Sequence, residues 1–179
     1  LSDSITEPLD LTDSLLAHVI EQLKSLHQLA VDASLPKINI REAAEAYWQI
    51  FESKHPNDEL LKMKAVMQVI MEEPPEGDFC LCHMDPVLAN WLYTPQGLQL
   101  LDWEYAGIAH PLWDLAAFWQ GIKEQFTIDE DNKTQMLELE KLEEKILTLY
   151  GVADLTAWRR ANLQMEYLSS LWYRAQSDG

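Results

Sequence analysis

Residues 81–92 read LCHMDPVLANWL and place three polar side chains at fixed spacing between apolar residues. His83 is followed by Asp85 two positions later and by Asn90 five positions after Asp85. Short apolar runs surround this stretch, and the residues Thr-Pro-Gln-Gly between two of them are typical of a turn. The pattern predicts short strands around a hairpin, with the polar residues in the only strand-rich segment of the chain. The expected strands are 79–82, 91–93 and 98–101.

The spacing of His83, Asp85 and Asn90 is that of the catalytic loop of kinases. A carboxylate in this loop orients the hydroxyl that attacks the γ-phosphate of ATP, so Asp85 is predicted to be the catalytic base. His83 is predicted to hold the loop backbone in a supporting catalytic role. The run LLDWEYAG at residues 100–107 places Asp102 where kinases have their main magnesium-binding carboxylate. The predicted metal ligands are therefore Asn90 and Asp102, with Mg²⁺ as cofactor and ATP as co-substrate.

Amphipathic patterns on both sides of this segment predict helices, and proline or glycine residues mark several of their ends. In one of them, over 41–53, the apolar residues Ala44, Tyr47, Trp48 and Phe51 are expected to face the core. The predicted fold class is α+β and predominantly α-helical. The expected helices are 12–29, 41–53, from about Asn57 to the Pro74-Pro75 pair, 111–125, 133–150 and 154–176.

The composition limits the class of protein and its partners. A chain of 179 residues, 47% of them hydrophobic, can bury the core of one globular domain. Its net charge of −17 argues against nucleic acid and anionic membrane as partners and favours small cations. No apolar run approaches a membrane span, so no membrane insertion is expected. Cys80 and Cys82 are expected to be buried free thiols, which indicates a reducing cytoplasm, and no Cys or His spacing indicates zinc.

Two longer motifs extend the likeness to kinases. The chain resembles the aminoglycoside phosphotransferase and choline/ethanolamine kinase superfamily, most specifically over residues 80–118, through CHMDPVLANWLY and LQLLDWEYAGIAHPLWDLAAF. The DWEYAG run is most similar to the choline kinase and thiamine kinase branches. The resemblance implies the C-terminal lobe of a protein-kinase-like fold, with a small β-hairpin carrying the catalytic and metal-binding loops. Because no glycine precedes Gly77, residues 1–179 are expected to be this lobe alone, without the N-terminal β lobe and its Gly-rich loop.

The resemblance implies an enzyme that transfers phosphate from ATP, with Mg²⁺, to a hydroxyl of a small cationic metabolite of the choline, ethanolamine or thiamine type. It also implies that Glu104 touches a second metal or the substrate cation, and that Tyr105 and Trp172 bind the substrate. Choline kinases tend to have two tryptophans three residues apart on the last helix, but Ser169 stands at the earlier position. Thiamine or another hydroxylated amine therefore stays open as the substrate. The chain alone is expected to be inactive, because half of the nucleotide cleft would belong to the other lobe.

Some residues and the whole chain have alternative interpretations. Asp114 could be catalytic, but at the start of a helix behind the site it is expected to be a structural anchor. His27 is expected to be a packed helix residue rather than a ligand, and Glu104 has a plain surface acid as its alternative. For the whole chain, the alternatives are an aminoglycoside phosphotransferase and a non-catalytic remnant lobe that only binds a ligand or partner.

Overall fold

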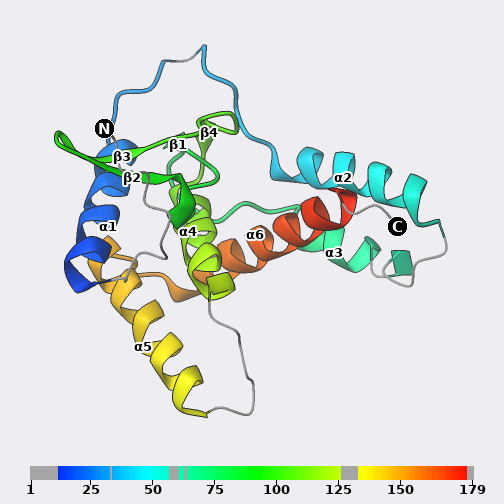
Figure 1. The fold of residues 1–179 in the computed structure, drawn as a ribbon. Helices are drawn as coiled ribbons and strands as arrows, with labels where there is room; N and C mark the ends of the chain where they lie inside the picture. The colour runs from blue at the N-terminus through cyan, green and yellow to red at the C-terminus, as the bar shows by residue number, and fades with distance from the viewer. Residues whose placement is uncertain (1–11, 33, 57–60, 63, 126–132, 177–179) are drawn as a thin grey trace.

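Helix α4, Pro111–Gln125, lies between the other helices of the fold (Figure 1). All of its residues from Leu112 to Ile122 are buried, as expected of a helix that is largely apolar on every face. The computed structural model describes residues 12–32, 34–56, 61–62, 64–125 and 133–176. In this part of the chain, no helix is both long and apolar enough to cross a membrane.

The other helices form two groups beside α4 (Figure 1). In the first group, α6, Leu155–Gln176, packs against α4 and also against α2, Ile40–Lys54. The short helix α3, Lys64–Ile70, contacts α6 as well. In the second group, α1, Asp13–His27, packs against α5, Lys133–Tyr150. One continuous hydrophobic core runs through both groups, so the described helices form a single packed unit.

Two small antiparallel sheets carry the loops that contain the polar motifs. Strand β1, Cys80–Cys82, pairs with β4, Gly107–Ala109. Strand β2, Trp91–Thr94, pairs with β3, Gly97–Leu100, as a hairpin. The loop after β1 therefore contains His83, Asp85 and Asn90, and the loop between β3 and β4 contains Asp102. The two motifs meet because both loops adjoin the same pair of strands.

The segment that leads to α2 lies along β4. The backbone N–H of Ile108 donates to the carbonyl of Pro36 at 2.7 Å, and the carbonyl of Ile108 accepts from Ile38 at 2.9 Å. Gly107 is required at this crossing, because a Cβ there would lie 2.6 Å from the Pro36 carbonyl oxygen. Residues 36–38 are thus held directly against the strand that follows the Asp102 loop.

The structure confirms five of the predicted helices and corrects the remaining one. Helices α1, α2, α4, α5 and α6 agree with their predicted ranges to within two residues at each end. The third predicted helix is too long, because residues 61–62 form a 3₁₀ turn and α3 covers only seven residues, none of them fully buried. Its predicted start at Asn57 lies outside the described residues. The three predicted strands are present as β1, β2 and β3, whereas β4 was not predicted.

Candidate active site

A buried carboxylate fixes the loop after β1. Asp114, in the first turn of α4, is completely buried and accepts hydrogen bonds from the backbone N–H groups of His83 at 2.8 Å and Met84 at 2.6 Å. One of its oxygens also lies 3.1 Å from Nε2 of His27. These partners compensate for the cost of burying a carboxylate. Asp114 therefore has the contacts expected of a structural anchor, and His27 is packed in the interior, away from the pocket described below.

His83 joins the two loops of the site. Its Nδ1 lies 3.3 Å from the backbone N–H of Asp85 and accepts from it, so Nε2 carries the proton and donates to the Leu101 carbonyl at 2.8 Å. The imidazole also packs edge-on against Trp103, with 4.8 Å between the ring centroids. Because His83 is completely buried, it positions the backbone of both loops and has no surface to offer to a substrate.

Asp85 is half-buried, and Asn90 holds it in place. The amide nitrogen of Asn90 donates to the Asp85 carboxylate at 3.0 Å and to the Asp85 backbone carbonyl at 2.8 Å. Burial raises the pKa of Asp85 above its ordinary value, the hydrogen bond from Asn90 opposes this shift, and the negative charges of Asp102 and Glu104 add to it. A carboxylate with a raised pKa is a stronger base, so Asp85 is suited to accept a proton from a hydroxyl group.

Asn90 and Asp102 are arranged so that both can offer oxygen atoms near Asp85. The amide nitrogen of Asn90 donates a hydrogen bond to Asp85, which leaves the amide oxygen able to coordinate a metal ion. Its backbone carbonyl accepts from the N–H of Leu101 at 2.8 Å, which holds the Asp102 loop beside it. Asp102 is exposed and has a left-handed backbone conformation, with φ of +64°. Amide and carboxylate oxygens are hard ligands, so this pair fits a Mg²⁺ ion held jointly with nucleotide phosphates.

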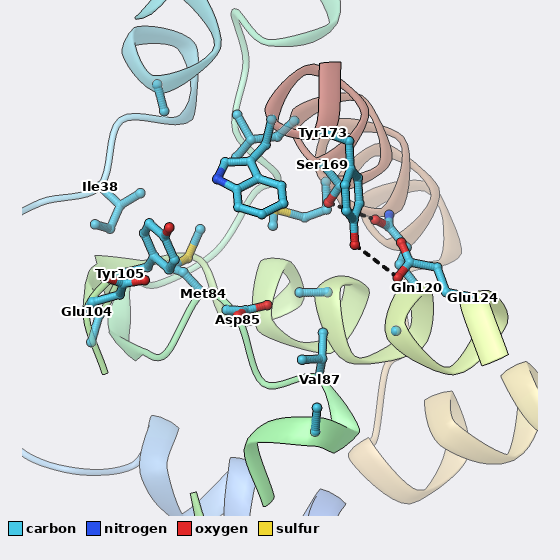
Figure 2. A pocket seen from close by; sticks show the side chains of 18 of the residues that line it. Ile38, Met84, Asp85, Val87, Glu104, Tyr105, Gln120, Glu124, Ser169 and Tyr173 are labelled. Carbon is cyan, nitrogen blue, oxygen red and sulfur yellow. Dashed lines mark hydrogen bonds between the residues drawn. The ribbon is translucent and has the colours of Figure 1, made fainter. Parts of the chain in front are cut away.

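A pocket of about 750 Å³ opens beside Asp85. Helices α2, α4 and α6 line it together with the two loops. Figure 2 shows Asp85 between Glu104 and Tyr105 on one side and Gln120 and Glu124 on the other. The loop after β1 therefore forms part of the wall of a cavity of the size that binds small molecules.

The charged side chains in this pocket are all acidic. Asp85, Glu104 and Glu124 line it, and the described lining residues include no Lys, Arg or His. Burial, and after it the negative charge of Glu104, raises the pKa of Tyr47 and of Tyr105. Such a pocket attracts cations and repels anions.

Aromatic side chains lie beside these acids. Tyr47 comes from α2, Tyr105 from the loop before β4, and Trp172 and Tyr173 from α6. The Tyr173 hydroxyl donates to the Glu124 carboxylate at 3.3 Å (Figure 2). Aromatic faces next to a carboxylate form the kind of environment that holds quaternary or aromatic cations.

Four predicted site residues line the pocket, and the other three do not. Those in the pocket are Asp85, Glu104, Tyr105 and Trp172, and those outside it are His83, Asn90 and Asp102. Sequence reasoning missed Gln120 and Glu124. For Gln120, a polar residue within the apolar part of α4, a signal was available, whereas Glu124 lies in the polar end of the helix and had none. Tyr47 was predicted to face the core, and this was wrong in part: it is only half-buried and lines the pocket, because α2 borders both.

A model of the phosphotransferase enzyme family matches residues 4–163 of the chain. The chain belongs to this family. Thiamine kinases from Shigella boydii and Escherichia coli K12 are 33% identical to this chain over 89 residues, which is 50% of this chain and 32% of each relative. The matched part of this chain thus spans about a third of the length of these curated relatives. The family match confirms the resemblance seen in the motifs around His83 and Asp102.

Solved structures of kinases and phosphotransferases share the fold of this chain. Choline kinase LicA from Streptococcus pneumoniae has a TM-score of 0.68 at 22% identity, over 89% of this chain and 54% of that chain. An aminoglycoside phosphotransferase from Streptomyces rimosus, APH(3'')-Id in complex with ADP and streptomycin, has a TM-score of 0.64 at 18% identity, over 86% of this chain and 61% of that chain. At such identities the likeness establishes the kinase-like fold and no substrate.

Proposed function

We propose that this chain is the acceptor-binding, C-terminal lobe of an ATP- and Mg²⁺-dependent kinase that phosphorylates a hydroxyl group of a small cationic metabolite. The observation that carries this proposal is that Asp85, with its raised pKa, lies in the wall of a pocket whose charged lining residues are all acids. A cation entering this pocket would bring its hydroxyl group to a carboxylate able to take the proton. The similarity to thiamine kinases and the choline kinase-like fold support the same reaction class.

In the proposed reaction, the acceptor oxygen forms a bond to the γ-phosphorus of ATP while the bond from that phosphorus to the oxygen bridging to ADP breaks. Asp85 takes the proton of the acceptor hydroxyl. Asn90 and Asp102 would hold a Mg²⁺ ion that neutralises charge on the phosphates. Asp114 keeps the catalytic loop in register throughout, because its hydrogen bonds to the loop do not involve the substrate.

The pocket favours a thiamine-type substrate over choline. Glu104 supplies a charge, and Tyr105 and Trp172 supply ring faces, each worth about 0.5–2 kcal/mol toward a cation. Ser169 offers a hydroxyl where an aromatic ring would complete a choline cage, and it donates to Gln120 at 3.4 Å. This polar wall suits a larger substrate that has hydrogen-bonding groups as well as a positive charge.

Glu124 favours a second candidate, an aminoglycoside substrate. It lies across Asp85 from Glu104 in the same pocket, so the site presents carboxylates on two sides (Figure 2). Two separated carboxylates match a substrate with several amino groups, whereas thiamine or choline needs only one.

A phosphotransfer assay with radiolabelled ATP and Mg²⁺ on the complete protein containing this chain tests the proposal. The acceptors are thiamine, choline, ethanolamine and kanamycin. We expect thiamine to be phosphorylated fastest, and a clear preference for kanamycin would select the second candidate. Absence of transfer to every acceptor, with binding retained, would leave a binding module instead of an enzyme. We also propose a cytoplasmic location for this reaction, which the free, buried thiols of Cys80 and Cys82 support.

A further inference from the structure

A cluster of potential metal ligands lies behind the catalytic loop, outside the pocket. In the part of the chain that the structure describes, one group of three His, Cys, Asp or Glu side chains has ligand atoms within 4.8 Å of one another: His27, Cys80 and Cys82. His27 is the last residue of α1, and the cysteines alternate along β1 with both side chains buried on the same face. No spacing in the sequence indicates this group, because His27 comes from a distant helix.

We propose that His27, Cys80 and Cys82 form a binding site for a soft or borderline metal ion, such as Zn²⁺ or Cd²⁺. The two Sγ atoms lie 3.7 Å apart. Two thiolates on one tetrahedral zinc ion, with Zn–S bonds of 2.3 Å, would be about 3.8 Å apart, so the sulfur atoms already have the separation that the ion requires. Imidazole together with thiolate is a ligand set that selects zinc over Mg²⁺ or Ca²⁺.

The surroundings of His27 fit the role of a metal ligand. Its Nε2 lies 3.1 Å from the Asp114 carboxylate and its Nδ1 lies 2.7 Å from the Tyr150 hydroxyl. Whichever nitrogen takes the metal gives up one of these contacts, and the other nitrogen keeps a partner that fixes the ring. Metal-bound histidines almost always have such a partner on the second nitrogen. The His27 side chain is only 5% exposed, so the ring is held rather than free to rotate into water.

The charges of the cluster also balance when a divalent ion is bound. Binding replaces the two thiol protons of Cys80 and Cys82 by one M²⁺, which gives two metal–sulfur bonds, releases two protons and leaves the cluster neutral. A neutral cluster costs little to bury, whereas an isolated thiolate would be expensive.

Titration of the reduced 179-residue chain with Cd²⁺ tests the proposal. Cys80 and Cys82 are the only cysteines in the sequence, so the ultraviolet charge-transfer band of cadmium thiolate can come from them alone. We expect the band to saturate at one Cd²⁺ per chain, with two protons released. When urea unfolds the chain, its affinity for Cd²⁺ should fall. His27→Gln should weaken binding at least about tenfold. His18→Gln, which changes an exposed histidine of the same helix, should leave the affinity unchanged.

If His27→Gln does not fold, measurements on the wild-type chain alone can still refute the proposal. A folded, reduced wild-type chain that shows no band with excess Cd²⁺ would overturn the proposal. So would an equal affinity in urea, because two cysteines in an unfolded chain would then suffice. Full affinity in a folded His27→Gln variant would remove the histidine from the site and overturn the proposed ligand set.

Discussion

Replacement of Asp114 by alanine tests the idea that one buried carboxylate holds the catalytic loop. The change leaves the N–H groups of His83 and Met84 without their acceptor, in a place that water does not reach. An unsatisfied buried donor costs about 1–3 kcal/mol, so two of them should lower the free energy of unfolding by about 2–6 kcal/mol. A natural domain is stable by only about 5–15 kcal/mol, so this loss is large.

Asp154→Ala is a matched control, because Asp154 also accepts from two backbone N–H groups but is exposed. Its partners are Thr156 at 2.8 Å and Ala157 at 3.1 Å, in the first turn of α6. Water can replace this cap, so its loss should cost only about 0.5–2 kcal/mol. Urea unfolding followed by tryptophan fluorescence measures both variants. Equal losses would refute the argument, because burial of the two amides would then make no difference.

The remaining predictions concern the reaction of the complete protein. Asp85→Asn should lower kcat by about 10²- to 10⁴-fold and leave the free energy of unfolding unchanged, and near-normal turnover would remove Asp85 from the mechanism. Because burial raises the pKa of Asp85, kcat/KM should fall with decreasing pH through a pKa above that of an ordinary aspartate. A kcat/KM that stays constant as the pH falls would contradict this. Asp102→Ala should abolish activity at any practical Mg²⁺ concentration, whereas restoration by high Mg²⁺ would exclude it as the main ligand. Trp172→Ala should raise KM for the cationic acceptor several-fold and leave KM for ATP unchanged; if neither constant moves, Trp172 does not contact the substrate.

The sequence was sufficient for elements with a strong local pattern. The apolar repeat of α1 and the caps and turns at the ends of α5 and α6 are local signals, and each helix lies where it was expected. The His83 and Asp102 motifs were also recognisable, because their spacing along the chain carries the chemistry. For these elements, neighbouring residues determine the conformation, so reading the chain in order was enough.

Features that depend on distant pairing could not be predicted. Strand β4 has three residues and exists through its pairing with β1, which lies far back in the sequence. Glu124 belongs to the pocket only because α4 passes between the loops and α6, and nothing next to it in the sequence indicates a binding site. Tyr47 follows the apolar repeat of a core residue and does pack against the core, but it also lines the pocket, because α2 borders both.

The hydrogen bonds of Pro36 and Ile38 to Ile108 have a consequence for how the acceptor pocket can change. Pro36 and Ile38 line that pocket, and β4, to which they are bonded, pairs with the strand that leads into Asp85. One wall of the pocket and Asp85, the proposed base, therefore belong to the same hydrogen-bonded unit, joined where Gly107 has no side chain. Moving this wall outward for a bulkier acceptor would also displace the base, so selectivity on this side can be tuned only by exchanging side chains. The opposite wall is helix α6, which carries Ser169 and Trp172 and is joined to this unit by side-chain packing.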